Sequence, residues 1–208
     1  MPRKTKDEAE KTKQSILKAA EDVFFTHGVA RTSLQQIAEA AGVTRGAVYW
    51  HFKDKVDLLW TIADNIFLPH EDLLDRLVEQ KDGDLLTLLY TEAMASLDAM
   101  FNNIHHRRVF TVLTQRCEYI EEMAPLMKRN NACRDRLFVK LEAIFQAVHD
   151  KGQLSSLWQP KVAALALHSM LYGTTHVEAE WEKPSRKRDK ARREAFAAFF
   201  ASLRAPAS

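Results

Sequence analysis

The segment from Thr32 to Lys55 restricts the fold more than any other, and it reads T-S-L-Q-Q-I-A-E-A-A-G-V-T-R-G-A-V-Y-W-H-F-K-D-K. Thr32 or Ser33 is a suitable helix N-cap, and a glutamine three positions later completes a capping box. A helix is therefore expected to begin near Leu34, with apolar residues recurring at helical spacing. Gly42 follows the last of them, where a residue with positive φ ends a helix at the lowest cost. The segment predicts two short helices joined by a tight turn.

The second short helix is expected to follow Thr44 as its N-cap. Ala47 and Val48 are expected to point toward the core. The outward side is then left with a cation, a glycine and two aromatic rings: Arg45, Gly46, Tyr49 and Trp50. In a DNA-reading helix-turn-helix the second helix enters the major groove, where arginine pairs with guanine edges and hydroxyl groups reach phosphates. The pattern therefore indicates binding to double-stranded DNA.

A third helix is expected directly afterwards, with Phe52 anchoring the end of the second and Asp54 as the N-cap of the third. Lys53 and Lys55 then flank a helix amino terminus, which is a natural phosphate site. The predicted roles are base-edge contact for Arg45 and Gly46, phosphate contact for Thr32, Ser33, Thr44, Tyr49, His51 and Lys55, and a mixed packing and backbone role for Trp50.

The first residues carry a small cluster of positive charge at Arg3, Lys4 and Lys6. One interpretation is an arm that follows the DNA backbone or enters the minor groove. The other is a disordered terminus that only aids solubility. The sequence leaves both open.

The run from Ala41 to Lys55, A-G-V-T-R-G-A-V-Y-W-H-F-K-D-K, resembles the amino-terminal domain of the TetR family of bacterial transcriptional regulators. The opening M-P-R-K-T-K, the helix end Phe24-Phe25-x-x-Gly28, the run V-A-R-T-S-L and the C-E-Y at Cys117 are similar to the AcrR-like repressors of multidrug efflux pumps. The strong resemblance covers roughly the first sixty residues, and the helix layout beyond them is more weakly similar. It implies a ligand-responsive repressor that binds a pseudo-palindromic operator as a homodimer.

The rest of the chain is predicted to be all-α, because it has few glycines and no strand-like alternation of any length. After a long helix over 54–80, interrupted by Pro69, helices are expected over 85–102, 105–118, 122–151, 160–180 and 188–203. This gives about nine helices. We expect residues 1–54 to form a three-helix DNA-binding domain and residues 55–208 a larger helical domain for ligand binding and dimerisation.

Composition narrows the class of protein. With 208 residues, of which 46% are hydrophobic, the chain can bury a sizeable core, and it lacks a long apolar run that would span a membrane. No apolar stretch follows the charged start, and the two cysteines indicate no disulfide framework, so a cytoplasmic location in a bacterium is expected. The net charge of +2 supports nucleic-acid binding only weakly.

The last two predicted helices carry broad apolar stripes that call for a partner. One stripe is made of small or flexible residues, Ala163, Ala166, Met170, Gly173 and Val177, and the other of Phe196, Phe199, Phe200 and Leu203. Ordinary core packing is the alternative. Members of the TetR family dimerise through a four-helix bundle of these two helices, so the resemblance favours a docking surface.

The predicted larger domain interleaves bulky apolar side chains with a few polar groups, a mixture that suits a pocket for amphipathic small molecules. Most of these residues are also ordinary core candidates, and each histidine taken alone is more often a surface or core residue. The predicted ligand contacts are Phe67, His70, Leu74, Leu77, Phe101, Phe110, Thr114, Phe145, His168, Tyr172 and His176. Hydrophobic or aromatic inducers are expected, and the apolar Phe67 argues against a preference for cations, because some relatives place a carboxylate there.

No catalytic or metal-binding pattern is present in the sequence: there is no phosphate loop, nucleophile elbow, H-x-x-x-H or C-x-x-C pair. Adjacent His105 and His106 diverge by about 100° on a helix and do not share a face. We therefore expect neither enzymatic activity, nor a cofactor, nor a metal. A basic run over 182–190 fits a solvated loop or a contact with an acidic partner.

Two other classes of function stay open. One is a DNA-binding regulator, an activator or a protein-switched protein, without a small-molecule inducer. The other is a helical interaction module that does not bind DNA, which would leave the exposed face at Arg45 and Tyr49 unexplained.

Overall fold

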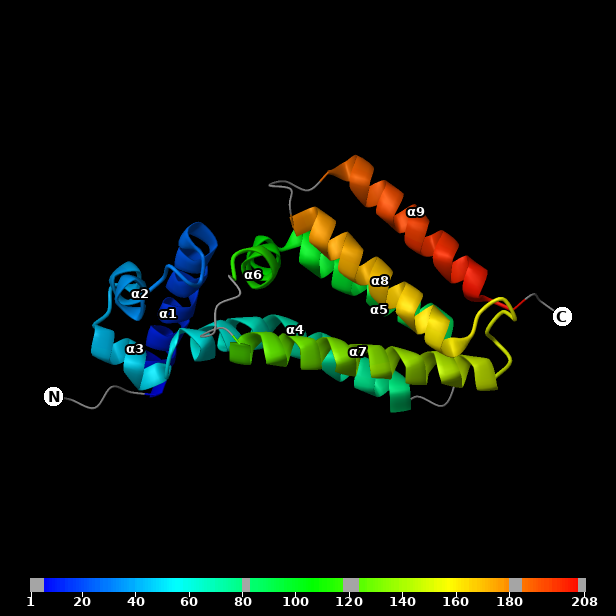
Figure 1. Cartoon of the computed structure of the whole chain (residues 1–208), viewed down its shortest axis with the longest axis horizontal. Coiled ribbons are helices and arrows are strands. Elements are labelled where there is room, and N and C mark those ends of the chain that lie inside the picture. Colours follow the sequence, from blue (N-terminus) through cyan, green and yellow to red (C-terminus); the bar gives the residue numbers. More distant parts are fainter. Residues whose placement is uncertain (1–5, 80–82, 118–123, 180–184, 206–208) are drawn as a thin grey trace. The chain divides into compact units, whose positions relative to one another are not determined.

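The computed structural model describes residues 6–79, 83–117, 124–179 and 185–205, without the side chains of residues 67–73 and 179. Within these ranges the chain is helical, apart from turns and one isolated bridge between Leu154 and Arg204. This confirms the all-α prediction. The helices, labelled in Figure 1, are α1 (Lys6–His27), α2 (Leu34–Ala41), α3 (Arg45–His51), α4 (Lys55–Glu79), α5 (Leu85–Asn102), α6 (Ile104–Gln115), α7 (Ala124–Asp150), α8 (Pro160–Ala179) and α9 (Arg186–Leu203).

The chain divides into two compact units. Unit 1 comprises residues 1–67 and 107–129, and unit 2 comprises residues 68–106 and 130–208. Unit 1 thus contains the predicted helix-turn-helix together with parts of α4, α6 and α7. The functional boundary expected at residue 54 remains a prediction.

A single hydrophobic core fills unit 1. Ile16 and Phe24 of α1, Ile37 of α2 and Val48 of α3 are fully buried in it. The later segments of the unit contribute Leu58, Leu59, Ile62 and Ile66 of α4, Val109 and Val112 of α6, and Leu126 of α7. The three amino-terminal helices are therefore stabilised by residues that lie far away in the sequence.

Helix α6 and the residue after it are tied to α1 and to the turn that follows α1. Arg108 forms an ion pair with Asp22 at 2.6 Å, and its guanidinium lies 4.8 Å from the ring centroid of Phe25. Beyond α1 the backbone N–H of Val29 donates to the carbonyl oxygen of Arg116 at 3.0 Å. Gly28 makes this turn with a φ of 82°, and a Cβ on it would meet the same carbonyl oxygen at 3.4 Å. A glycine is therefore favoured there for two independent reasons.

Unit 2 is built around α5, which packs against both α8 and α9; Figure 1 shows α8 lying along it. On the α9 side, Phe196, Phe200 and Leu203 are buried, and the Phe200 ring lies 5.1 Å from that of Tyr90. These α9 residues belong to the core of their own chain. For these three residues the interpretation as a docking surface was wrong, because an amphipathic stripe does not reveal whether its partner lies in the same chain. Phe199, the fourth member of the predicted stripe, is half-buried, with its ring 5.4 Å from that of Trp158.

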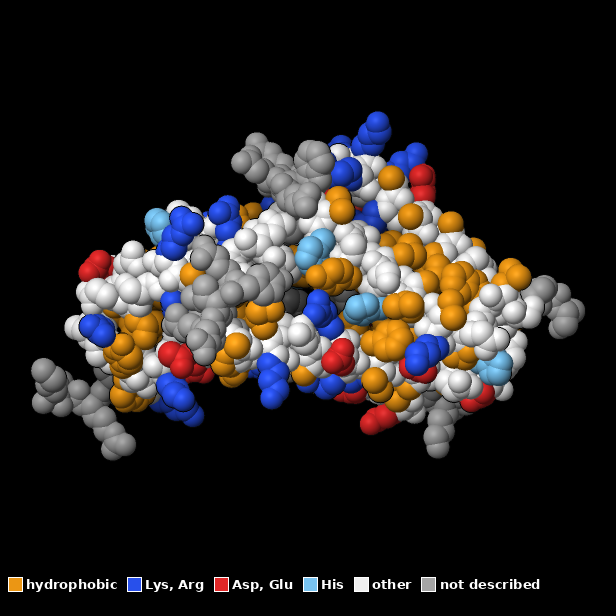
Figure 2. Space-filling model, in the orientation of Figure 1, with side chains coloured by type: hydrophobic (Ala, Val, Ile, Leu, Met, Phe, Trp, Pro, Cys, Tyr) orange, Lys and Arg blue, Asp and Glu red, His pale blue; other side chains and the backbone are white. Residues whose placement is uncertain are grey.

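The outer side of α8 is apolar and open. Leu165 is 55% exposed and Val177 is 53% exposed, and Val162 and Tyr172 are exposed as well. Small residues of α9, among them Ala191, Ala195 and Ala198, are exposed as well. Figure 2 shows hydrophobic side chains gathered over α8 and α9 on the right of the view. Of the predicted small-residue stripe, Gly173 and Val177 lie on this face, whereas Ala163 is buried within the chain.

A backbone hydrogen bond and an ion pair to distant segments secure the end of α9. The Leu203 carbonyl oxygen accepts a hydrogen bond from the Ser155 N–H at 2.8 Å, and Arg204 forms an ion pair with Asp84 at 2.9 Å. A hydrogen bond from Thr87 is the main reason that the pKa of Asp84 falls to about 2, and Arg204 lowers it further. Among the described helices, none is sufficiently long and apolar to traverse a lipid bilayer.

Candidate nucleic-acid interface

The first helix of the predicted motif begins and ends as the sequence indicates. Ser33, rather than Thr32, is the N-cap of α2, and it forms a reciprocal capping box with Gln36. Gly42 ends α2 with a φ of 67°, and its N–H donates to the carbonyl oxygens of Ala38 and Glu39. The orientation of the turn is thus set by local hydrogen bonds.

The second helix, α3, presents the predicted outward face. The Thr44 hydroxyl oxygen accepts the N–H of Ala47 at 3.2 Å, and Val48 is completely buried. Because Val48 fixes the inward side, Tyr49 and Trp50 are left 47% and 73% exposed. Two neighbouring exposed aromatic side chains on one short helix mark a candidate surface for interaction with another molecule.

Arg45 and Tyr49 form a pair on this exposed face. The Arg45 Nη2 donates to the Tyr49 hydroxyl oxygen at 3.1 Å, and the guanidinium carbon lies 5.3 Å from the centroid of the Tyr49 ring. The two residues are one helical turn apart, so the contact holds the guanidinium over α3. Arginine has five N–H donors in a planar fork, and this one bond leaves most of them for other acceptors.

Gly46 lies between these groups and is not required by the fold. A Cβ on Gly46 would meet only the Thr44 hydroxyl oxygen, at 3.9 Å, within 4 Å. Its φ is not in the positive region. The fold therefore does not require a glycine here, and the bare backbone leaves room for a molecule that approaches α3 from outside.

The structure gives Thr32 and Lys55 internal roles beside the predicted phosphate contacts. Thr32 is 3% exposed, and its hydroxyl donates to the Gly28 carbonyl oxygen at 2.8 Å. The Lys55 ammonium donates to the carbonyl oxygens of Ala30 at 3.2 Å and of Thr32 at 3.4 Å. Both side chains hold the turn before Ser33 in place.

The start of α4 carries a second reciprocal cap. Asp54 accepts the N–H of Asp57 at 2.8 Å, as predicted, and the Asp57 carboxylate accepts the N–H of Lys53 at 3.0 Å. The Lys53 side chain is exposed beside this helix terminus. The predicted phosphate contacts included Lys55 and not Lys53, because the sequence does not reveal which of two neighbouring lysines turns inward. His51 is half-buried, with its ring edge-to-face against Trp50 at 4.5 Å.

The predicted ligand contacts are divided between the two units. The side chains of Phe67 and His70 lie outside the described residues. Phe110 and Thr114 are half-buried in unit 1, where the Thr114 hydroxyl donates to the Phe110 carbonyl oxygen at 2.8 Å. The remaining members belong to unit 2: Leu74, Leu77, Phe101, Phe145, His168, Tyr172 and His176.

Within unit 2, three of these residues form one row along α8. The His168 ring stacks on Tyr172 at 6.3 Å, and the Tyr172 ring lies 4.1 Å from His176. Phe138 and Arg134 of α7 extend the row, with the Arg134 guanidinium 5.8 Å from the Tyr172 centroid. Burial lowers the pKa of His168, and the positive charge of Arg134 lowers it further. Neutral imidazole is therefore favoured at His168.

Phe101, Leu77 and Phe145 are buried. The guanidinium of Arg192 lies 3.7 Å from the Phe101 ring centroid and also pairs with Asp189. One face of the Phe101 ring is therefore already occupied by the chain's own α9. The burial of Phe101 is explained by packing alone.

The capped turn at Gly42, the buried Val48 and the outward Arg45–Tyr49 pair together define a helix-turn-helix protein. Similarity to known proteins agrees with this class. Residues 16–60 match the family described as bacterial regulatory proteins, tetR family, and residues 84–181 match the C-terminal region of the MAATS-type transcriptional repressors.

The chain is 36% identical over 171 residues to the HTH-type transcriptional repressor BepR of Brucella suis, an alignment that covers 82% of each chain. It resembles the crystal structure of NalD, the secondary repressor of the MexAB-OprM multidrug efflux pump in Pseudomonas aeruginosa, with a TM-score of 0.83, 34% identity and coverage of 97% of this chain and 100% of that one. The SmeT–triclosan complex is similar at a TM-score of 0.80 and 28% identity, covering 94% of this chain and 92% of that one. This protein belongs to the TetR family of transcriptional regulators.

Proposed function

We propose that this protein is a ligand-responsive transcriptional repressor of a multidrug efflux operon. The exposed Arg45–Tyr49 pair on α3, in a chain similar to BepR and NalD over most of its length, carries the proposal. The names of these relatives favour a repressor over an activator or a protein-switched regulator. They are transcriptional regulators, so an enzyme is not favoured either.

In this proposal Arg45 and Gly46 contact base edges in the major groove. Ser33, Thr44, Tyr49, His51 and Lys55 contact phosphates of the DNA backbone, and Trp50 packs against the backbone. We assign Thr32 a supporting role, because its hydroxyl is engaged inside the turn.

We further propose that the protein acts as a homodimer. The exposed apolar side of α8, with Leu165 and Val177, and the small residues of α9 form a face suited to a second copy of the chain. One α3 reads too few base pairs to define a genomic site. Two copies related by a two-fold axis would read a pseudo-palindromic operator.

The inducer is proposed to be a hydrophobic, aromatic small molecule. The SmeT structure is a complex with triclosan, so triclosan is the first compound to test as an inducer of this protein. The His168–Tyr172–His176 row offers stacking surfaces and hydrogen-bonding groups of the kind that such molecules use. To release DNA, the inducer must bind more tightly to the conformation that does not fit the operator.

Fluorescence polarisation on the DNA upstream of the protein's own gene, compared with scrambled DNA, tests this proposal. Tight specific binding that triclosan or another aromatic compound releases is the expected result. Specific binding that no compound of an aromatic panel disturbs would reject ligand response while keeping DNA recognition. Equal affinity for specific and scrambled DNA would reject an operator in that region.

A further inference from the structure

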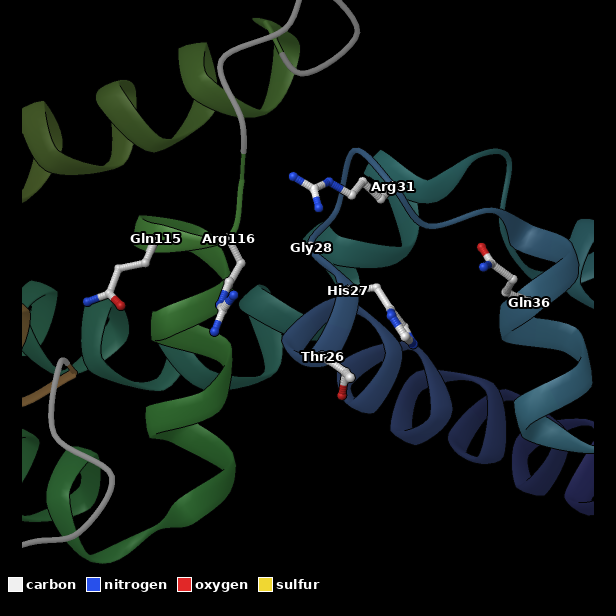
Figure 3. A pocket seen from close by; sticks show the side chains of 7 residues that line it. All are labelled: Thr26, His27, Gly28, Arg31, Gln36, Gln115 and Arg116. Carbon is white, nitrogen blue, oxygen red and sulfur yellow. The ribbon is translucent and has the colours of Figure 1, made fainter.

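Unit 1 contains a polar pocket of about 310 Å³, which is seen from close by in Figure 3. It is lined by the end of α1, the turn after it, the first turn of α2 and the end of α6, with polar side chains such as Thr26, Gln36 and Gln115. An aromatic molecule binds best to a largely apolar surface with rings to pack against. This pocket is therefore a poor site for an aromatic inducer, and the rings of unit 2 are better candidates.

Four rings of unit 2 form an aromatic row, made of Phe138 on α7 and of His168, Tyr172 and His176 on α8. The members on α8 are four residues apart, so they follow one side of the helix for about 12 Å at 1.5 Å per residue. Tyr172 is 40% exposed, and the two histidines are half-buried. A molecule with two fused rings can therefore reach the row from solvent and cover more than one of its members.

A cation lies over this row. The guanidinium carbon of Arg134 is 5.8 Å from the centroid of the Tyr172 ring, and the Nη2 of Arg134 donates to the side-chain oxygen of Asn131. Both partners are neutral, and no carboxylate among the residues that the structure describes forms an ion pair with Arg134. The charge of Arg134 is thus uncompensated, and most of its five N–H donors remain for other acceptors.

Arg192 is the contrasting case in unit 2. Its guanidinium lies 3.7 Å from the Phe101 ring centroid, but it also pairs with the carboxylates of Asp98, at 3.7 Å, and of Asp189. The side chain of Arg192 is 6% exposed. Of these two pairs of a ring and a cation, the one at Tyr172 presents an open and unneutralised positive charge.

The neighbouring imidazole of His168 does not change the sign of this charge. Burial lowers the pKa of His168, and the positive charge of Arg134 lowers it further, so neutral imidazole is favoured. Arginine stays protonated throughout the physiological pH range. The aromatic row therefore combines rings for stacking with a permanent positive charge.

This combination favours aromatic ligands that carry a negative charge. The ligand ring packs on the row, and an anionic oxygen accepts a charge-assisted hydrogen bond from the guanidinium of Arg134. A cationic ligand meets repulsion from the same group. Because Arg134 is exposed and screened by solvent, an anion should bind about 3- to 10-fold more tightly than its neutral analogue.

We propose that the aromatic row selects aromatic anions, such as phenolates and aromatic carboxylates, over neutral and cationic analogues, and that Arg134 determines this selectivity. The selectivity rests on the proposed function, because it assigns a charge to the inducer proposed for the same row.

Calorimetry of the full-length protein with three probes of similar shape measures this selectivity. Naphthoate is an anion, naphthamide is neutral and naphthylmethylammonium is a cation. At low ionic strength naphthoate should bind about 3 to 10 times more tightly than naphthamide, and the cation should bind most weakly. Arg134→Gln should reduce the ratio of naphthoate to naphthamide affinity to less than about two, whereas Arg134→Lys keeps the charge and should retain most of the ratio.

Arg136→Gln is the matched control. Arg136 is an exposed cation of the same helix, and it lies about 200° around α7 from Arg134, on a different side. This variant should change the ratio less than about twofold, because solvent and salt screen the more distant charge. Thermal melting of each variant verifies that it is folded.

Release of operator DNA by the same probes, followed by fluorescence polarisation, separates the selectivity from the proposed function. Naphthoate should release DNA at lower concentrations than naphthamide, and Arg134→Gln should remove this difference. If naphthoate binds selectively through Arg134 but no probe releases DNA, the selectivity stands and the row is not the inducer site. If an aromatic compound releases DNA but naphthoate and naphthamide bind the wild type equally, ligand response stands and the selectivity is rejected.

Three further results would overturn the proposal. One is the absence of saturable naphthoate binding to the wild type. Another is an equal loss of naphthoate and naphthamide affinity in Arg134→Gln, because Arg134 would then act through packing rather than charge. The third is an equal change of the ratio in Arg136→Gln and Arg134→Gln, because the effect would then be one of net charge.

Discussion

Replacing Arg45 by alanine is the sharpest test of the DNA-reading face. A bidentate arginine–guanine contact contributes about 1 to 3 kcal/mol of discrimination, so specific affinity should fall about 5- to 150-fold. Affinity for scrambled DNA depends mostly on phosphate contacts and should change much less. Val48 is buried and carries the packing of α3, whereas Arg45 is exposed, so the variant should stay folded.

The hydrogen bond from Arg45 to Tyr49 allows a second, linked test. Tyr49→Phe keeps the ring under the guanidinium and removes only the hydroxyl that accepts at 3.1 Å. A hydrogen bond of this kind contributes about 0.5 to 1.5 kcal/mol, which corresponds to a 2- to 10-fold loss of specific affinity. If Tyr49 acts by holding Arg45, the loss should shrink once Arg45 is already alanine.

Fluorescence polarisation of both single variants and the double variant, on operator and scrambled duplexes at one salt concentration, measures these differences. Two results would refute the reasoning. An equal loss on both duplexes for Arg45→Ala would remove its base-edge role, and a Tyr49→Phe effect that is the same with and without Arg45 would mean that the hydroxyl acts alone.

Four further outcomes are expected. Lys55→Met should lower the unfolding free energy by about 1 to 2 kcal/mol, because the ammonium no longer holds the carbonyls of the α1–α2 turn. An unchanged denaturant midpoint would reject that role. If the variant also lowers the slope of log K against log salt for DNA binding by about one, Lys55 contacts a phosphate as well. Gly42→Ala should cost about 1 to 2 kcal/mol at a φ of 67°, lowering the melting temperature by about 2 to 8 °C, whereas Gly46→Ala should leave it unchanged or raised; equal effects would contradict the φ argument. Leu165→Asp should convert a dimer into a monomer in sedimentation, and a persistent dimer would exclude this face of α8. The pKa of His168 should lie below its usual 6.5 in an NMR titration, because burial disfavours the imidazolium. The contribution of this imidazole to the unfolding free energy is then present above pH 6.5 and is lost as the pH falls. A titration midpoint above 6.5 would contradict the burial argument.

Local signals predicted the helices well. The cap at Thr44 and the left-handed Gly42 follow from the residues themselves, and the structure contains both. The expected helix over 85–102 coincides with α5, and the other expected bounds differ from those of the structure by a few residues. These features depend on neighbours within a few positions along the chain, which a sequence displays directly.

Features that depend on packing were harder to predict. The inward turn of Lys55 is decided by carbonyl groups at residues 30 and 32, which α4 meets only in the folded unit. The burial of Phe200 depends on Tyr90 of α5. The pocket lined by Arg31 and Arg116 has no sequence signal, because it joins a turn and a helix end that are far apart along the chain.

The shared core of unit 1 limits how such regulators can be recombined. Val109, Val112 and Leu126 fill the same core as Ile37 and Val48, so the DNA-reading part is not a cassette that can be cut at residue 54 and transplanted. In a chimera joined at residue 54, the amino-terminal helices would pack against α6 and α7 residues of a different protein. The mismatched core would then contain cavities or clashes. Exchange of operator specificity between relatives should therefore transfer residues 107–129 together with the amino-terminal helices, or confine the change to the exposed side of α3.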